Sequence, residues 1–377
     1  MTISDLIGAT PLVPLRRLFP ADGPHVLVKA EFLNPGGSVK DRIAREMVDA
    51  AEAAGELVPG STIVEATSGN TGAGLALIAA ERGYDAVFVC GPKVSDEKVG
   101  VLRAYGATVI RSRGDVAPEH PSSSRSIAEH LLEVIPDAWS SQQYDNRHNP
   151  AAHRRTTGPE IWEQTGGAIT HLVANVGTGG TISGTGAHLK EVSGGSVTVI
   201  GADPAGSAYS GEVAPFLVEG AGRIYADRAL WPSTYDESVV DHLEAVADAE
   251  SFAWAHLAAR HEGLLLGGSA GTALAAASRW APRLTAEHTL VVIPADSGRS
   301  YLSKVYDDAW LAEQGLRDEV ERIIGEVRER RGLRAPAALP LDALPEDVRP
   351  SVAHGGGTPA DAAPVGDRTT SALQPTA

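Results

Sequence analysis

Short apolar runs alternate with longer segments of helical periodicity along most of this chain. Runs of aliphatic and β-branched residues predict strands over residues 62–65, 86–90, 108–111, 171–175, 197–203 and 289–294. The segments between them repeat their apolar positions with a helical period, which predicts helices over residues 42–54, 72–82, 97–105, 183–192, 249–262 and 271–280. Such alternation predicts an α/β fold with parallel-stranded sheets and helices on both faces.

The 377 residues are too many for one small core and suit two α/β domains. A last helix is expected over residues 308–330, with an interruption near Gly315. After Gly332 the chain is rich in Ala, Pro and Gly and cannot bury enough apolar surface to order itself. Residues 332–377 are therefore predicted to form a disordered tail.

Composition and charge exclude several classes of partner. The formal net charge of −16 argues against nucleic acid and against anionic membrane surfaces, because both need clustered Lys and Arg. No apolar run is long enough to cross a membrane, and residues 1–15 lack the pattern of a secretory signal. Cys90 is the single cysteine, so an intrachain disulfide and a cysteine-based metal site are impossible. Cys90 is expected to be a small buried strand residue, and a cytoplasmic location fits.

A first motif, Asn34-Pro-Gly-Gly-Ser-Val-Lys-Asp-Arg42, opens a predicted helix. Its lysine, Lys40, could belong to a surface charge cluster. It could also be an amine that forms an imine with an aldehyde cofactor, which requires partial desolvation so that the amine loses its proton.

Two further motifs lie where a predicted strand turns into a helix. In Thr62-Ile-Val-Glu-Ala-Thr-Ser-Gly-Asn-Thr-Gly72, hydroxyl and N–H groups gather at a helix start, which suits a carboxylate, although a Ser/Thr-rich helix cap is the simpler alternative. In Val176-Gly-Thr-Gly-Gly-Thr-Ile-Ser-Gly184, small residues let the backbone approach a phosphate closely. The glycine spacing fits neither the dinucleotide fingerprint nor a P-loop, so a plain tight turn stays open.

The order of these motifs resembles the fold type II pyridoxal-phosphate (PLP) enzymes, in the branch of cysteine synthase and cystathionine β-synthase. The resemblance also covers Gln142-Gln-Tyr-Asp-Asn146 and Thr156-Thr-Gly-Pro-Glu-Ile-Trp162. It implies a two-domain, tryptophan synthase β-like fold. Residues 1–40 and 150–331 would form a larger cofactor-binding domain, and residues 41–149 a smaller mobile one.

The resemblance also implies roles at matching positions. Lys40 would be the Schiff-base lysine of pyridoxal 5′-phosphate and the general base. The cofactor would be held by Asn70 at its phenolic oxygen, by Gly177, Thr178, Gly179, Gly180 and Thr181 at its phosphate, and by Ser297 at its ring nitrogen. The substrate would be bound by Thr67, Ser68, Thr71 and Gln143 at its carboxylate, and by Tyr144, Glu219 and Gly222 near the entrance. No metal is implied.

The activity implied is β-replacement on serine or an activated serine through an aminoacrylate. Tyr144 after Gln143 and the segment Val218-Glu-Gly-Ala-Gly222 resemble the cystathionine β-synthase subfamily. Glu219 would meet the amino group of a second amino acid, and Gly220 and Gly222 would leave room for it. Homocysteine is therefore expected slightly ahead of sulfide.

One segment, Arg223-Ile-Tyr-Ala-Asp-Arg-Ala-Leu-Trp231, is longer and more basic than that subfamily pattern. It leaves open a nitrogen nucleophile, as in a diaminopropionate synthase. Arg154 and Arg155 are either solvated helix charges or contacts for an acidic nucleophile. A catalytically silent binding or regulatory paralogue is a third alternative, against which the retained Lys40 argues. Amino-acid substrates and a homodimer are the partners that the resemblance implies.

Overall fold

A smaller parallel sheet carries the first half of the predicted motifs. The computed structural model describes residues 1–335 except 68, 93, 114–115 and 117–119. The sheet has four strands in the order β5-β4-β3-β6. Their bounds are β3 Thr62–Ala66, β4 Asp85–Cys90, β5 Thr108–Arg111 and β6 Ala138–Trp139. Parallel pairing aligns Thr62 with Asp85 and Ala66 with Val89.

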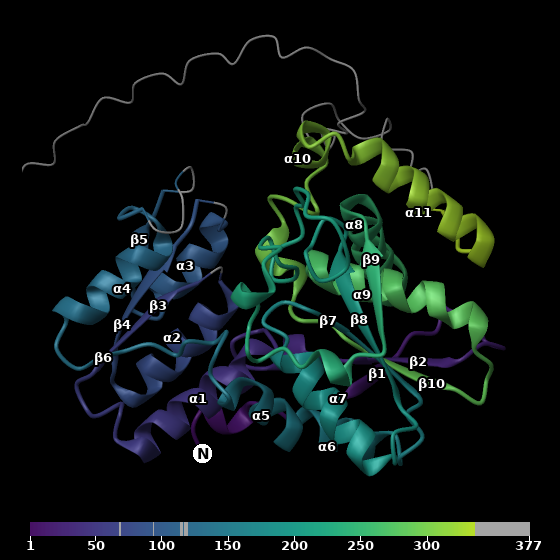
Figure 1. The fold of residues 1–377 in the computed structure, drawn as a ribbon. Helices are drawn as coiled ribbons and strands as arrows, with labels where there is room; N and C mark the ends of the chain where they lie inside the picture. The colour runs from purple at the N-terminus through teal and green to yellow at the C-terminus, as the bar shows by residue number, and fades with distance from the viewer. Residues whose placement is uncertain (68, 93, 114–115, 117–119, 336–377) are drawn as a thin grey trace, which may run out of the picture. The chain divides into compact units, whose positions relative to one another are not determined.

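Alternation along β3 and β4 distributes apolar side chains to both faces of this sheet. Ile63 and Phe88 pack with one set of helices and Val64 and Val89 with Ala128 on the other face. The helices of the first set are α1 Lys40–Ala54, α2 Asn70–Arg82 and α3 Asp96–Ala104, and the helix carrying Ala128 is α4 Ser124–Val134. Figure 1 shows these helices around β3, β4 and β5. Cys90 is fully buried in β4, as predicted.

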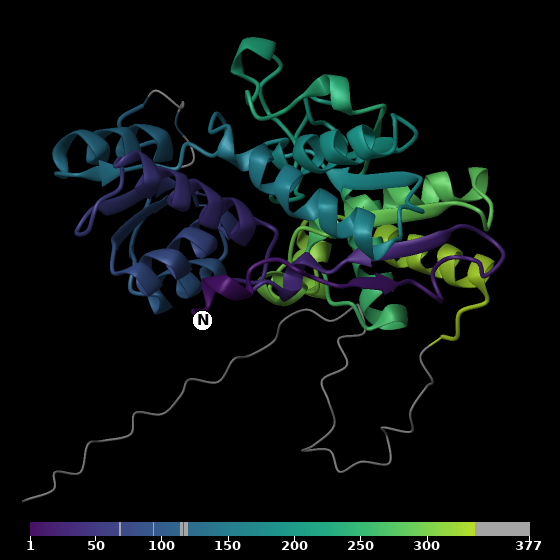
Figure 2. The ribbon, with the colours of Figure 1, turned by 90° about the horizontal axis from the view of Figure 1, so that it is seen from below.

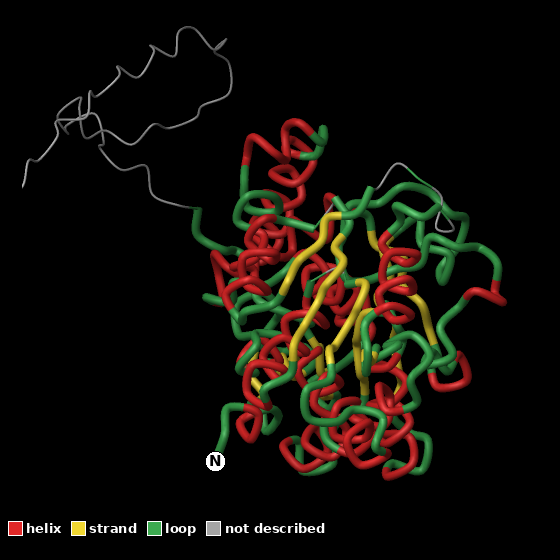
Figure 3. The backbone as a smooth tube through the Cα atoms, turned by 90° about the vertical axis from the view of Figure 1, so that its left-hand side faces the viewer, coloured by secondary structure: helices red, strands yellow, loops and turns green. Residues whose placement is uncertain are grey.

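A larger sheet is built from residues on both sides of the smaller one in sequence. Its order is β1-β2-β10-β7-β8-β9, parallel except for the antiparallel pair β1–β2. The strands are β1 Leu12–Pro14, β2 His25–Lys29, β7 His171–Asn175, β8 Thr198–Pro204, β9 His242–Val246 and β10 Thr289–Ile293. Figure 3 shows the strands of the fold enclosed by helices.

Helices cover both faces of the larger sheet. On one face Val173 and Val292 pack with α8 Asp248–Leu257, α9 Gly268–Trp280 and α11 Arg317–Arg331. On the other face Leu172 and Val291 pack with α6 Thr157–Gln164 and α7 Gly180–Val192. The remaining helices are α5 His148–Arg155 and α10 Asp308–Glu313. The layering can be followed from a second direction in Figure 2. The predicted α/β class with helices on both faces is confirmed.

Several elements differ from the prediction. The predicted strands and helices are found, with α1 beginning earlier, at Lys40, and the last helix divided into α10 and α11. Strands β1, β2, β6 and β9 and helices α4, α5 and α6 were not predicted. Lys29 shows why β2 is hard to recognise, because a charged residue in a buried strand breaks the apolar pattern.

The predicted domain boundaries are not tested by this arrangement. Residues 1–333 form one unit that contains both sheets. The division at residues 41 and 149, and the mobility of residues 41–149, therefore stay predictions. The predicted disorder of residues 332–377 falls, from residue 336 on, outside the described residues.

Candidate active site

The first residue of α1, Lys40, lines a pocket with residues from both sheets. The pocket is lined by Lys40, Asn70, Thr71, Lys98, Gln143, Tyr144, Gly177, Thr178, Gly220, Ala221, Gly222, Ser269 and Ala295. An adjoining pocket shares Lys40 and Gly177 and extends to Gly179 and Thr181. Sequence motifs that are more than 100 residues apart thus meet at one place, where strands end and helices begin.

The environment of Lys40 favours the neutral amine. Burial lowers the pKa of Lys40, although the negative charge of Asp296 acts in the opposite direction. Among the described residues, no hydrogen bond to the Lys40 ammonium group is formed. An amine with a lowered pKa more readily loses its proton and gains a lone pair, with which it can attack an aldehyde or take up a proton.

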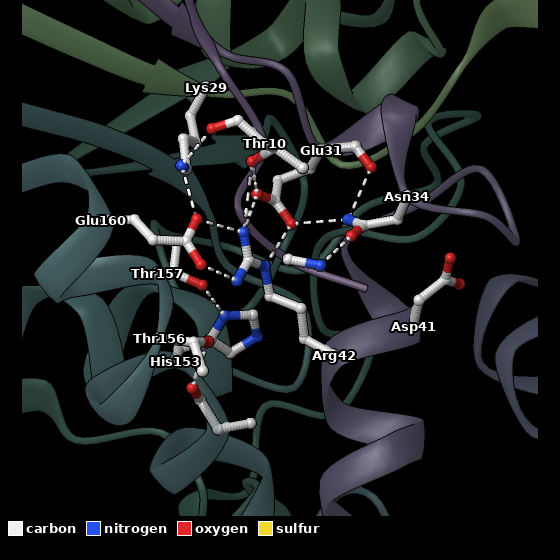
Figure 4. Close-up of polar contacts among 12 residues, drawn as sticks. Thr10, Lys29, Glu31, Asn34, Asp41, Arg42, His153, Thr156, Thr157 and Glu160 are labelled. Carbon is white, nitrogen blue, oxygen red and sulfur yellow. Dashed lines mark hydrogen bonds and ion pairs between the residues drawn. The ribbon is translucent and has the colours of Figure 1, made fainter. Parts of the chain in front are cut away.

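A buried ionic cluster fixes α1 two residues beyond Lys40 (Figure 4). Arg42 donates to Glu31 from Nε at 2.7 Å and from Nη2 at 2.8 Å, and to both oxygens of Glu160 at 2.7 Å. Lys29 donates to Glu160 at 2.6 Å and to the Thr10 carbonyl at 2.5 Å. We call these five residues the Arg42 cluster. Because Arg42 and Glu31 are almost fully buried, the cluster holds the start of α1 in one position.

The segment 177–181 forms a tight glycine cradle that leads into the first residues of α7. Gly179 has φ +84° and a side chain there would strike Tyr235, while one at Gly180 would strike Asn149. The loop is also pinned from outside: Tyr209 donates to the Gly177 carbonyl at 2.9 Å. Glycine at these two positions therefore lets the loop backbone pack directly against Tyr235 and Asn149. A loop of small residues at a helix start is also what the approach of a phosphate to backbone N–H groups requires.

Both threonines of the cradle contact buried side chains. Thr178 accepts a hydrogen bond from Asn149 at 3.0 Å. Thr181 Oγ1 lies 3.2 Å from His153 Nε2, and His153 Nδ1 lies 2.9 Å from Thr157 Oγ1. Burial lowers the pKa of His153 well below its usual range, so the ring is neutral and can exchange one hydrogen bond with each hydroxyl. The role of His153 was not foreseen from the sequence.

The second motif divides into structural and pocket-facing residues. Thr67 accepts hydrogen bonds from the amides of Gly69 and Gly72, both at 3.1 Å, and does not line the pocket. Thr71 lines it and donates to Gln143 Oε1 at 2.7 Å. Thr71 and Gln143 are thus brought together as the carboxylate prediction requires, while Thr67 caps α2. The predicted contact Ser68 lies outside the described residues.

Asn70 is paired with a carboxylate that sequence reasoning missed. Its Nδ2 donates to Asp296 Oδ2 at 2.7 Å, and the Tyr301 hydroxyl donates to the same oxygen at 2.6 Å. Asp296 Oδ1 is buried without a hydrogen-bond partner. Burial raises the pKa of Asp296, against the lowering effect of Lys98 and of these hydrogen bonds. Asp296 therefore orients Asn70 and supplies a negative charge near Lys40.

A second ionic cluster lies at the side of the pocket. Glu219 accepts from Lys98 at 2.5 Å through Oε2 and from Lys304 at 2.6 Å through Oε1. Lys98 also donates to the Tyr301 hydroxyl at 3.2 Å and lies over that ring, 4.3 Å from its centroid. We call these four residues the Lys98 cluster. The prediction that Glu219 meets an incoming amino group stays a prediction, but both of its oxygens are already paired with lysines.

Lys98 was missed because it looks like a solvated residue in the first turn of a helix. Ser95 caps α3 by accepting from the Lys98 amide, and this cap directs the turn toward the pocket. The capping serine is visible in the sequence, but the sequence does not show that the first turn of α3 faces the pocket. Arg154 and Arg155, by contrast, pair with Glu191 and Glu46 at the surface and line neither pocket.

The structure separates two candidate serines. Ser297 lines neither pocket, and its hydroxyl accepts from the Arg299 amide at 3.3 Å. Ser269, buried near the start of α9, lines the same pocket as Lys40. Tyr144 and Gly222 line this pocket as well, and their contact with substrate near its entrance stays a prediction.

Two kinds of feature were not found in the described part of the chain. No group of His, Cys, Asp or Glu residues there is arranged to hold a metal ion. No helix there has the length and apolar character needed to cross a membrane.

Known proteins share this arrangement. The family model described as pyridoxal-phosphate dependent enzyme matches residues 3–295. The chain is 43% identical over 318 residues to the cystathionine β-synthase of Apis mellifera, covering 82% of this chain and 62% of that protein. It is 42% identical over 311 residues to a probable cysteine synthase of Bacillus subtilis, covering 81% of this chain and 96% of that protein.

A solved structure agrees with these sequence matches. The O-acetylserine dependent cystathionine β-synthase from Helicobacter pylori has a TM-score of 0.74 and 36% identity, covering 81% of this chain and 97% of that one. The chain thus spans less than two thirds of the animal relative but nearly the whole length of the bacterial ones.

Proposed function

Since the chain belongs to the family of pyridoxal-phosphate dependent enzymes, we propose that it replaces the β-substituent of serine or an activated serine with a sulfur nucleophile. The relatives named cystathionine β-synthase and cysteine synthase support a sulfur nucleophile over a nitrogen one. A silent paralogue is disfavoured because the pocket keeps an amine, a glycine cradle and a polar carboxylate seat together.

The position of Lys40 carries this proposal. Lys40 lies between the cradle at Gly177–Thr181 and the pair Thr71–Gln143, and it lines both pockets. Its pKa is lowered by burial. An amine in this setting can serve first as the attachment point for an aldehyde cofactor and then as a base for the substrate.

The residues present fit pyridoxal 5′-phosphate. Gly177, Thr178, Gly179 and Thr181 line the pocket beside Lys40 at the start of α7, where backbone N–H groups suit a phosphate. Asn70, held by Asp296, would donate to the phenolic oxygen. We propose Ser269 in place of Ser297 for the ring nitrogen, since Ser269 lines the pocket and Ser297 does not.

The chain's own groups divide the chemistry among them. When bound, the cofactor supplies an aldehyde that condenses with amines and a ring that accepts the electron pair left at Cα. Thr71 and Gln143 would hold the substrate carboxylate. Lys40 would take the Cα proton at Nζ, and the Arg42 cluster keeps this nitrogen in place by fixing α1.

The test uses the pair of lysines that line the pocket. After borohydride reduction of the holoenzyme, peptide mass spectrometry should find the cofactor on Lys40 and leave Lys98 unmodified. Lys40→Ala should lose the visible absorption and at least about 10³-fold of turnover, because the attachment point and the base disappear together. Product is measured by mass spectrometry from serine or O-acetylserine with homocysteine or sulfide.

Lys190→Ala is the matched control, because Lys190 pairs with Asp241 on the surface of α7. It should keep both the absorption and the turnover. A Lys40→Ala enzyme that retained full turnover would contradict the proposal.

A cytoplasmic location and a homodimer also belong to this proposal, on the strength of the family resemblance. Sedimentation of the holoenzyme measures the second of these directly.

A further inference from the structure

The residue after Gly222, Arg223, is fixed by its backbone at the rim of the pocket. Its amide donates to Ser207 Oγ at 2.9 Å, and its carbonyl accepts from the Ala208 amide at 2.7 Å. Gly222 lines the pocket and has φ +83°. The root of the Arg223 side chain is therefore held one residue from the pocket wall.

The guanidinium of Arg223 lies among aromatic rings and has no acidic partner in the part of the chain that the structure describes. Its central carbon is 4.7 Å from the ring centroid of Tyr225 and 5.7 Å from that of Tyr144, which lines the pocket. One nitrogen donates to the Leu230 carbonyl, and Nε is buried without a hydrogen-bond partner. Within the described ranges, no carboxylate forms an ion pair with Arg223.

Arg228, five positions along the same segment, shows the contrast. It pairs with both oxygens of Glu237, at 2.9 and 3.0 Å, on the exposed surface. The chain has a net charge of −16, so most arginines can find an acidic partner. Arg223 lies beside the pocket and has none among the described residues. A guanidinium with unused donors is a good receptor for a carboxylate.

The charge of the neighbouring rim points the same way. Glu219, four positions before Arg223, is already bridged by Lys98 and Lys304. Together with Arg223, these side chains carry three positive charges, on Arg223, Lys98 and Lys304, and one negative charge, on Glu219. An excess of positive charge at this rim favours a carboxylate.

From these contacts we propose that Arg223 binds the carboxylate of the second substrate, so that the nucleophile is a thiol that carries a carboxylate, such as homocysteine, rather than free sulfide. This inference rests on the proposed function, since it assigns a recognition residue to the same pocket. Tyr144 would support the guanidinium from the side of the pocket. Arg223 replaces Glu219 as the residue that recognises the incoming amino acid.

The test compares homocysteine with 3-mercaptopropylamine, which is the same thiol without its carboxylate, and with sulfide. In Arg223→Gln holoenzyme, kcat/KM for homocysteine should fall roughly 10- to 100-fold, the range expected for charge-assisted hydrogen bonds. The fall should lie mainly in KM, and the values for the other two nucleophiles should stay within about twofold. Arg223→Lys should recover part of the lost kcat/KM for homocysteine, because lysine keeps the positive charge but cannot donate two parallel hydrogen bonds to a carboxylate.

Arg228→Gln is the control and should leave all three nucleophiles unchanged. An equal loss with every nucleophile, or none with homocysteine, would overturn the assignment, as would a wild-type enzyme that uses sulfide alone. Release of the leaving group without a nucleophile is measured separately. If wild-type enzyme neither releases it nor forms a product with any thiol, the proposed function itself fails.

Discussion

The Arg42 cluster and the Lys98 cluster contain similar charges but connect different parts of the molecule. In the Arg42 cluster the arginine is 2% exposed, Glu31 is fully buried, and the hydrogen bonds run between α1, the N-terminal segment and α6 (Figure 4). In the Lys98 cluster Glu219 is 19% exposed and joins α3 to the segments around Lys304 and Tyr301. Because Glu160 is also 20% exposed, the contrast lies between the buried pair Arg42–Glu31 and the partly solvated pairs of Glu219. The buried pair is expected to act on stability, and the partly solvated pairs on how two parts of the pocket are held together.

The largest expected effect comes from breaking the Arg42 cluster. Arg42→Met should lower the free energy of unfolding by about 3–5 kcal/mol, because Glu31 is left buried without its cation. Urea unfolding of the holoenzyme measures this. Arg154→Met, which breaks an exposed pair with Glu191, should cost no more than about 1 kcal/mol. Equal losses in the two variants would remove the distinction between buried and exposed pairs.

Asp41 lies beside the Arg42 cluster, but it forms no ion pair with the residues that the structure describes (Figure 4). It therefore shows what burial does to a carboxylate that lacks a cation. Its Oδ2 accepts from the Gly36 amide at 2.6 Å, and its Oδ1 is buried without a partner. Burial raises the pKa of Asp41 from 3.8 to about 7. The folded state holds the proton of the Asp41 carboxyl more tightly than the unfolded state does. The free energy of unfolding should therefore fall as the pH rises from 3.8 to about 7, and then level off.

The expected loss attributable to Asp41 between pH 5 and pH 8 is on the order of 2 kcal/mol. Asp41→Asn should lack this part of the pH dependence, because the amide does not ionise. Unfolding curves of both proteins across the window provide the measurement. Parallel pH profiles would show that Asp41 does not titrate there.

The smallest effect on stability is expected at the Lys98 cluster. Glu219→Gln should cost roughly 1 kcal/mol, because the carboxylate is partly solvated. Its clearer consequence should be faster amide hydrogen exchange in α3, which loses its link to Lys304, with no change in α2. Exchange measured by mass spectrometry separates the two helices. Unchanged exchange in α3 would mean that the cluster does not hold this side of the pocket.

Much of the fold was predictable because its signals are local. Strands β4 and β10 contain the apolar runs 86–90 and 290–293, and apolar periodicity marks α1, α2 and α9. Strands β2 and β6 escaped prediction for physical reasons. β2 ends on the buried charge of Lys29, and β6 has only the residues Ala138 and Trp139. In both cases pairing with neighbouring strands, and not local propensity, makes the strand.

Some residues of the candidate site could be predicted from the sequence, and others were found only in the structure. Lys40, Gly177–Thr181 and the pair Thr71–Gln143 could be proposed from the sequence, because each belongs to a motif that resembles those of a known family. Lys98, Asp296, His153 and Ser269 could not be assigned, since nothing in their own segments shows that they face the pocket.

The sequence by itself thus determined the α/β class and the order of the motifs, and the family resemblance named the lysine that is proposed to carry the chemistry. Only the tertiary structure decided which charges meet: that Glu219 is held by Lys98 and Lys304, and that Arg223 has no acidic partner among the described residues. The physical reason is that a motif encodes its own backbone geometry, whereas the strength of a charge depends on its burial and its partners. Those partners come from distant parts of the chain.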